Sequence, residues 1–106
     1  MQKKRIRRNI MISTTITINH PAGLHARPAA QFVKTAARFP CKISVRKLNS
    51  DKPPANAKSP LSVLTLGVNQ GDTVEIIAEG EEAQAALQAL VELVESNFGE
   101  TTVPQS

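Results

Sequence analysis

His25, Arg27 and Pro28 stand close together in the segment 23–30, which reads GLHARPAA. A histidine ring nitrogen can accept a phosphoryl group, and an arginine guanidinium offers a fork of donors that suits phosphate oxygens. Proline favours the first turn of a helix, where unpaired N–H groups and the helix dipole attract anions. The spacing therefore predicts that His25 is phosphorylated, with the charge held by Arg27 and by the helix start at Pro28 and Ala29. The alternative is an ordinary surface histidine in a loop.

Apolar residues follow Pro28 at helical spacing, namely Ala29, Phe32, Val33 and Ala36. This spacing predicts an amphipathic helix from Pro28 to Arg38, so that His25 lies just before the helix begins. Gly23 allows a tight turn in front of it. The second histidine, His20, precedes a proline and is expected in a loop near the site, without a chemical role of its own.

Two other kinds of pattern describe the rest of the chain. Segments that are rich in β-branched residues, or that alternate between apolar and polar residues, predict strands at 12–19, 41–46, 55–58 and 73–79. Ser59 followed by Pro60 predicts a short helix that is capped by the serine and ends before Gly67. A helical period over 83–98, closed by Gly99, predicts a long last helix.

The predicted order of elements is β-α-β-β-α-β-α, which is typical of the α+β class. Each predicted strand has one apolar face, and two of the helices are amphipathic. A four-stranded, mostly antiparallel sheet with the helices on one face would bury both sets of apolar residues in a two-layer sandwich. Residues 69–72, Asn-Gln-Gly-Asp, are expected to form a turn before the fourth strand.

Composition limits the class of protein. The chain has 106 residues, enough for one domain with a single core, and no apolar run is long enough to span a membrane. Three Phe residues with no Trp or Tyr argue against a stacking platform for nucleic acid. Cys41 is the single cysteine, which excludes an internal disulfide and suits a reducing compartment. We therefore expect a monomer in the cytoplasm that binds neither nucleic acid nor membrane.

The net charge of +4 comes from the N-terminal segment. Five of the 13 basic residues are Lys3, Lys4, Arg5, Arg7 and Arg8, which leaves eight against nine acidic residues in the remainder. We expect a disordered basic extension over 1–10, one domain over 11–99 and a frayed C-terminal tail over 100–106. The extension could instead bind nucleic acid or a membrane surface.

Three segments carry a resemblance to a known family. They are His25 to Ala29, Ala57 to Ser59, and Thr65 to Gly67. Together they resemble HPr, the histidine phosphocarrier of the bacterial phosphoenolpyruvate-dependent sugar phosphotransferase system. The resemblance covers about Ile12 to Phe98.

The resemblance implies a fold and a chemistry. The fold would be an open-faced β-sandwich. His25 would accept a phosphoryl group on Nδ1, as pros-phosphohistidine, from phosphorylated enzyme I and pass it to an enzyme IIA of sugar transport. Arg27 would stabilise this phosphate, and Ser59 would be the regulatory site of an ATP-dependent serine kinase. Such a protein is a phosphoryl carrier rather than a stand-alone enzyme, and we expect it to use no metal and no cofactor.

Partner docking requires an exposed apolar patch near His25. The candidates are Leu24, Ala30, Leu61 and Leu64. In the family the short helix offers two consecutive bulky apolar residues, and here Pro60 replaces the first of them. For Ser59 the alternative to a regulatory role is a plain helix cap.

Two other functions remain open at this stage. The chain could be a nitrogen-related or purely regulatory paralogue of the same system, because the chemistry at His25 would be the same. It could also be a small nucleic-acid-binding domain that uses the basic segment 1–10.

Overall fold

Four strands form one antiparallel sheet in the computed structural model, which describes residues 11–99. The sheet order is β1-β4-β2-β3, and every neighbouring pair is antiparallel. The strands are β1 (Met11–Thr17), β2 (Lys42–Lys47), β3 (Ala55–Asn56) and β4 (Thr73–Glu79). The first and last long strands of the sequence are therefore neighbours, and their pairing brings the loop after β1 beside the loop before β4.

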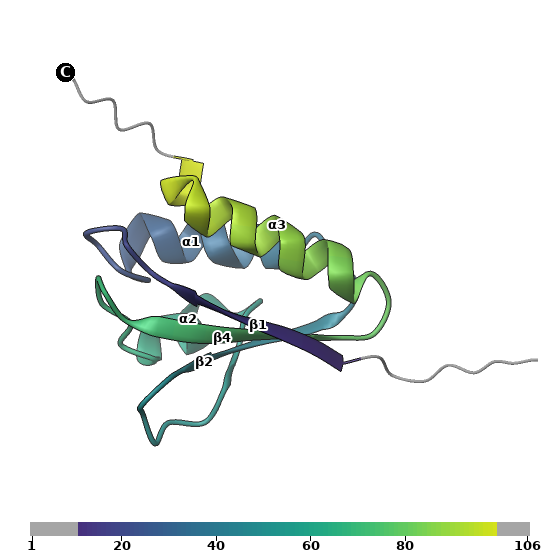
Figure 1. Ribbon diagram of the computed structural model, residues 1–106, viewed down its shortest axis with the longest axis horizontal. Helices are drawn as coiled ribbons and strands as arrows, with labels where there is room; N and C mark the ends of the chain where they lie inside the picture. Colours follow the sequence, from purple (N-terminus) through teal and green to yellow (C-terminus); the bar gives the residue numbers. More distant parts are fainter. Residues whose placement is uncertain (1–10, 100–106) are drawn as a thin grey trace, which may run out of the picture.

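Three helices and one short 3-10 turn complete the fold. They are α1 (Ala26–Ala36), α2 (Pro60–Thr65), α3 (Ala83–Glu95) and η1 (Asn97–Gly99). Helices α1 and α3 run side by side over one face of the sheet (Figure 1), whereas α2 contacts α1 and β3. This arrangement confirms the predicted α+β class and the open-faced, two-layer sandwich.

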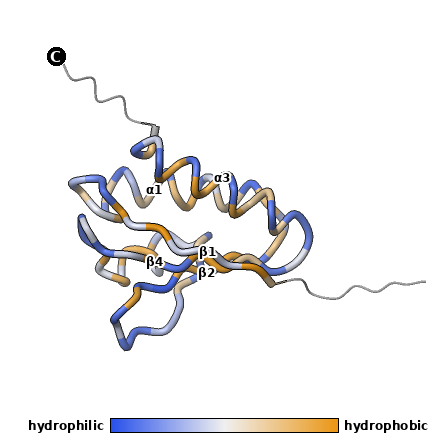
Figure 2. The backbone as a smooth tube through the Cα atoms, in the orientation of Figure 1, coloured by the Kyte–Doolittle hydropathy of each residue, from blue (hydrophilic) through white to orange (hydrophobic). Residues whose placement is uncertain are grey.

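The core forms between the sheet and the two long helices. In β4 the residues Val74, Ile76 and Ala78 are fully buried and alternate with partly exposed residues, as a strand with one covered face requires. Phe32 of α1 and Leu90 of α3 are also fully buried, and each such side chain contributes about 1.5–3 kcal/mol by leaving water. Hydrophobic and hydrophilic residues alternate along α3 (Figure 2), as expected of an amphipathic helix. The core thus fixes α1, and with it the residues at its N-terminus.

Three predicted helix boundaries, in two helices, are wrong. Helix α1 begins at Ala26 and ends at Ala36, two residues earlier at each end than the sequence predicts. Helix α3 ends at Glu95 and does not reach Phe98, which lies in η1 with a φ of 61°. The helical spacing of Phe98 misled the prediction, because a buried aromatic residue can continue an apolar stripe after the helix has ended.

Residues 1–10 and 100–106 lie outside the described part of the chain, so the predicted extension and tail, with the boundaries at 11 and 99, stay predictions. Within the described residues, no helix has the length and apolar character needed to cross a membrane.

Candidate functional site

His25 is the N-cap residue of α1. Its backbone is extended, with φ −126° and ψ 161°, and its side chain makes no capping hydrogen bond. Pro28 and Ala29 are buried in the first turn, which contains no acidic residue. Ala26 has a φ of 50°, in the left-handed region that costs about 1–2 kcal/mol for a residue with a Cβ. The partly exposed ring of His25 therefore stands at a helix start that carries no neutralising carboxylate.

Backbone hydrogen bonds join the loop that carries His25 to the loop between α2 and β4. Leu24 donates its N–H to the oxygen of Val68 at 3.0 Å. Ile18 donates to the oxygen of Asp72 at 2.8 Å, and Gly71 donates to the oxygen of Ile18 at 2.7 Å. Ile18, Leu24 and Val68 are fully buried, so the bond between Leu24 and Val68 is shielded from water. We call this pair of segments, 18–25 and 66–72, the paired loops.

The two loops approach closely at Gly23. This residue has a φ of 64°, and a Cβ added to it would lie 2.3 Å from the oxygen of Val68 and 2.8 Å from the Cα of Asn69. Only glycine fits such a position without moving a backbone segment. The sequence predicted a tight turn at Gly23, and the structure adds the close approach of the second loop.

His20 shapes the turn before Gly23. Its Nδ1 accepts a hydrogen bond from the N–H of Ala22 at 3.0 Å, and its backbone oxygen accepts one from Gly23 at 2.8 Å. His20 is 8% exposed, and its ring meets Phe98 edge to face, with 5.6 Å between ring centroids. His20 therefore supports the loop, as its place before a proline suggested, and the contact with Phe98 ties that loop to the segment after α3.

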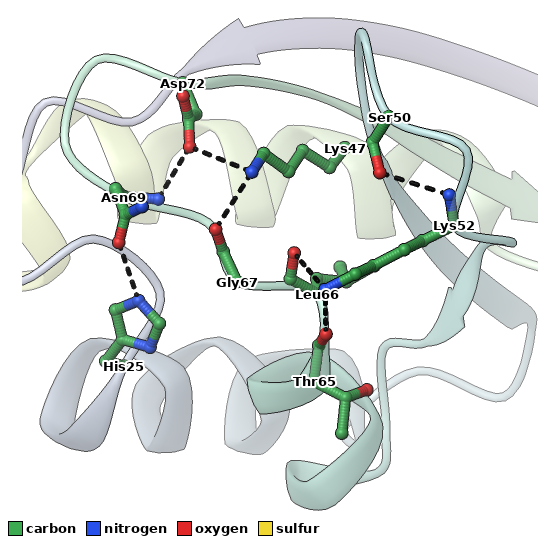
Figure 3. Close-up of polar contacts among 9 residues, drawn as sticks. All are labelled: His25, Lys47, Ser50, Lys52, Thr65, Leu66, Gly67, Asn69 and Asp72. Atoms are coloured by element: carbon green, nitrogen blue, oxygen red, sulfur yellow. Dashed lines mark hydrogen bonds and ion pairs between the residues drawn. The ribbon is translucent and has the colours of Figure 1, made fainter.

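Asn69 is the residue that sequence reasoning missed. Its Oδ1 lies 3.1 Å from Nε2 of His25, although the two residues are 44 positions apart (Figure 3). The backbone N–H of Asn69 donates to Oδ2 of Asp72 at 2.8 Å, which lowers the pKa of that carboxyl. Lys47 is a charged neighbour of Asp72, with 3.6 Å between Nζ and Oδ2. The sequence showed a turn at 69–72 but gave no sign that the turn faces the histidine.

Arg27 is exposed near the start of α1, and within the described part of the chain its guanidinium makes no ion pair or hydrogen bond. A free guanidinium beside His25 can turn toward an anion on the ring. No acidic side chain of the described residues has to be displaced first.

The docking candidates differ in exposure. Leu61 is 71% exposed and Leu64 is 40% exposed, both on α2, and Ala30 is exposed on α1. Leu24 is fully buried, so the expectation that it belongs to an exposed patch is wrong. Its backbone pairs with Val68, and its side chain belongs to the hydrophobic core instead of the surface.

Ser59 is the N-cap of α2, as predicted. Its Oγ accepts a hydrogen bond from the N–H of Ser62 at 3.3 Å, and Pro60 occupies the first helical position. The side chain is only partly exposed. The capping role predicted for Ser59 is therefore confirmed, and any further role stays a prediction.

Known proteins resemble this arrangement over most of the described residues. Residues 12–96 match the family model described as "PTS HPr component phosphorylation site". The chain belongs to the HPr family. HPr-family proteins are phosphocarriers of the phosphotransferase system.

Two curated relatives illustrate the range of HPr-family proteins. The "Phosphocarrier protein HPr" of Pseudomonas aeruginosa is 39% identical over 90 residues, which cover 85% of this chain and 98% of that protein. A "Multiphosphoryl transfer protein" of Haemophilus influenzae is 37% identical over 94 residues, or 87% of this chain. The chain spans only 19% of the length of the Haemophilus protein, and 22 to 24% of others with that name.

A solved structure of an HPr-family protein supports the fold. "HPr-C-His" from Thermoanaerobacter tengcongensis superposes with a TM-score of 0.77 and is 47% identical in sequence. The match covers 84% of this chain and 97% of that one.

Proposed function

We propose that this chain carries a phosphoryl group on His25, accepting it from phosphorylated enzyme I and passing it to an enzyme IIA of sugar transport. The observation that supports this most directly is the partly exposed His25 ring at the N-terminus of α1, with the free guanidinium of Arg27 two residues later. Membership of the HPr family supports the same chemistry.

The chemistry suits an exposed and reversible site. Transfer of a phosphoryl group through a loose transition state depends on in-line positioning and on charge stabilisation more than on covalent chemistry by the protein. A carrier must release the group as readily as it accepts it, so one guanidinium and one helix start are sufficient. Removal of Arg27 would cost about 1.5–3 kcal/mol, the range for a hydrogen bond to a charged group, or roughly a 10- to 150-fold slower transfer.

The direct test uses phosphoenolpyruvate, enzyme I and phosphorus NMR. We expect an acid-labile, base-stable adduct that is absent in His25→Ala and forms more slowly in Arg27→Ala. Arg38→Ala is the matched control, because Arg38 is an exposed arginine just beyond the other end of the same helix. If His25→Ala still carries the adduct, or if the two arginine variants are equally slow, the proposed roles are wrong.

The exposed leucines of α2 are the proposed docking patch. A charged residue at Leu61, the most exposed large apolar side chain in the described residues, should weaken complex formation with little effect on stability. We expect Leu61→Glu to slow transfer from enzyme I about tenfold. Met11→Glu is the control, because Met11 is 61% exposed but lies on β1. Equal effects of the two substitutions would argue against a specific patch.

We also propose that phosphorylation of Ser59 regulates transfer. A phosphate at this N-cap would add negative charge at a helix N-terminus, where it is tolerated, and close to the exposed Leu61 in sequence. It could then act by repelling an acidic surface of the partner without refolding the chain. Ser59→Asp should slow transfer from enzyme I, whereas Thr15→Asp, an added charge on β1, should not. Unchanged transfer in Ser59→Asp would remove the basis for regulation.

Two experiments distinguish the alternative functions. In the first, the phosphorylated chain is mixed with a sugar-specific enzyme IIA. A role in sugar transport requires that this enzyme IIA accept the phosphoryl group, whereas a nitrogen-related or regulatory role does not. Deletion of residues 1–10 should leave phosphoryl transfer intact. If the chain binds nucleic acid and loses that binding on deletion, the basic segment has a function of its own.

A further inference from the structure

We propose that Asn69 is a positioning residue that selects the nucleophilic nitrogen of His25. By accepting a hydrogen bond at Nε2, the Asn69 amide oxygen holds the imidazole in the tautomer whose Nδ1 carries a free electron pair. The inference rests on the proposed phosphorylation of His25: the resemblance to HPr already implies attack by Nδ1, and the inference adds the residue that prepares this atom.

The tautomer follows from the chemistry of the two groups. In a neutral imidazole one ring nitrogen carries a hydrogen and the other an electron pair. An amide oxygen can only accept a hydrogen bond. Since Oδ1 of Asn69 lies 3.1 Å from Nε2, the hydrogen must be on Nε2 and the electron pair on Nδ1. In Figure 3 the second ring nitrogen faces away from Asn69, so it is not occupied by this contact.

The backbone of Asn69 is held in place by hydrogen bonds within its turn. Its backbone N–H donates to Oδ2 of Asp72 at 2.8 Å, and the backbone N–H of Asp72 donates back to the oxygen of Asn69 at 3.0 Å. The ammonium of Lys47 lies 3.6 Å from the same Oδ2 and donates to the oxygen of Gly67 at 3.1 Å. These contacts fix both ends of the turn that presents Asn69 (Figure 3).

The proposed tautomer allows the transfer to proceed without moving a proton on this chain. The electron pair of Nδ1 forms the new N–P bond while the bond between phosphorus and the donor group of phosphorylated enzyme I breaks, and the electron pair of that bond returns to the donor. His25 keeps its hydrogen on Nε2 and becomes cationic, so the bond to Asn69 becomes charge-assisted and stronger. With the hydrogen on Nδ1 instead, the attacking electron pair would be missing. The hydrogen bond to Asn69 thus stabilises both the tautomer of His25 that accepts the phosphoryl group and the phosphorylated form of His25.

The test measures the tautomer directly in the unphosphorylated protein. Two-bond hydrogen–nitrogen NMR spectra of ¹⁵N-labelled histidine, recorded at about pH 9 where imidazole side chains are neutral, report which nitrogen carries the hydrogen. In the parent chain we expect His25 to be protonated on Nε2. In Asn69→Ala the ratio of Nε2–H to Nδ1–H should fall about fivefold, the factor that corresponds to the loss of one hydrogen bond of about 1 kcal/mol.

Two further variants separate tautomer selection from a structural effect on the loop. Asn69→Asp keeps an acceptor oxygen at the same place and should retain the Nε2–H form, although its added negative charge opposes phosphorylation. Gln70→Ala removes another side-chain contact of the same turn, the bond from Nε2 of Gln70 to the oxygen of Asn19, and should leave the tautomer and the transfer rate unchanged. In the assay with enzyme I, Asn69→Ala should be up to fivefold slower.

The outcomes distinguish this inference from the proposed function. An unaltered tautomer ratio in Asn69→Ala, a ring protonated on Nδ1 in the parent chain, or an equal change in Gln70→Ala would each overturn the role of Asn69. Those results would leave phosphorylation of His25 untouched. Conversely, if enzyme I does not phosphorylate the parent chain, the proposed function fails even where the NMR shows the expected tautomer.

Discussion

Replacing Gly23 by alanine should separate the paired loops. The new Cβ would lie 2.3 Å from the oxygen of Val68 and 2.8 Å from the Cα of Asn69, and both atoms belong to the backbone, so no side chain can turn away. The left-handed φ of 64° costs about 1–2 kcal/mol. Relief of the overlap costs about 1–3 kcal/mol, and loss of the bond between Leu24 and Val68 about 1 kcal/mol. We therefore expect Gly23→Ala to lower the free energy of unfolding by about 3–6 kcal/mol.

Urea denaturation measures this loss, and Gly71→Ala is its matched control. Gly71 lies in the opposite loop with a φ of 94°, but a Cβ there would have no atom within 4 Å. We expect Gly71→Ala to cost only the backbone term of about 1–2 kcal/mol. If the two variants are equally unstable, the close approach at Gly23 contributes nothing, and the account of the paired loops is wrong.

Three smaller effects follow from other contacts. The hydrogen bond from Arg46 lowers the pKa of Glu75 from its ordinary value of 4.5, so this pair stabilises the fold above about pH 4.5 and loses its effect as the pH falls below it. The free energy of unfolding from urea denaturation should therefore differ between the parent chain and Glu75→Gln by up to about 1 kcal/mol at pH 7, and the two values should converge at low pH; a constant difference would contradict this. Ser59→Ala should cost about 1 kcal/mol by removing the cap of α2, whereas Ser62→Ala, one turn later, should cost clearly less in the same assay. Lys52→Met should lower thermal stability slightly, because Nζ of Lys52 donates to the last carbonyls of α2 at 2.8 and 3.5 Å; an unchanged melting temperature would show that this exposed contact contributes nothing.

Local sequence patterns predicted the elements of this fold well. The alternation in β4 and the apolar stripe of α1 each reflect one covered face, and the burial of Val74, Ile76 and Phe32 confirms both. Ser59 and Gly67 were predicted as the two ends of α2 from capping chemistry alone, and Ser59 does cap the helix. Patterns of this kind succeed because their cause lies within a few residues of the chain.

Contacts between distant segments were beyond the reach of such patterns. Leu24 is apolar and precedes His25, as expected of a docking residue, and only the pairing with Val68 explains why it is buried. Phe98 continues a helical stripe although the helix has ended, because it packs against His20 across the structure. Asn69 is an ordinary turn residue until β1 and β4 pair and bring its loop to His25.

The same distinction separates two parts of the candidate site. The part that attracts an anion consists of Arg27 and the start of α1, and it lies within the five consecutive residues 25–29. It would be kept in any fold that leaves the N-terminus of this helix exposed. The orientation of the ring is different, since it depends on a bond across 44 positions and therefore on the pairing of β1 with β4. Substitutions such as Gly23→Ala that force apart the backbones of the paired loops should consequently slow phosphoryl transfer before they remove it, because the helix start remains while the imidazole loses its fixed direction.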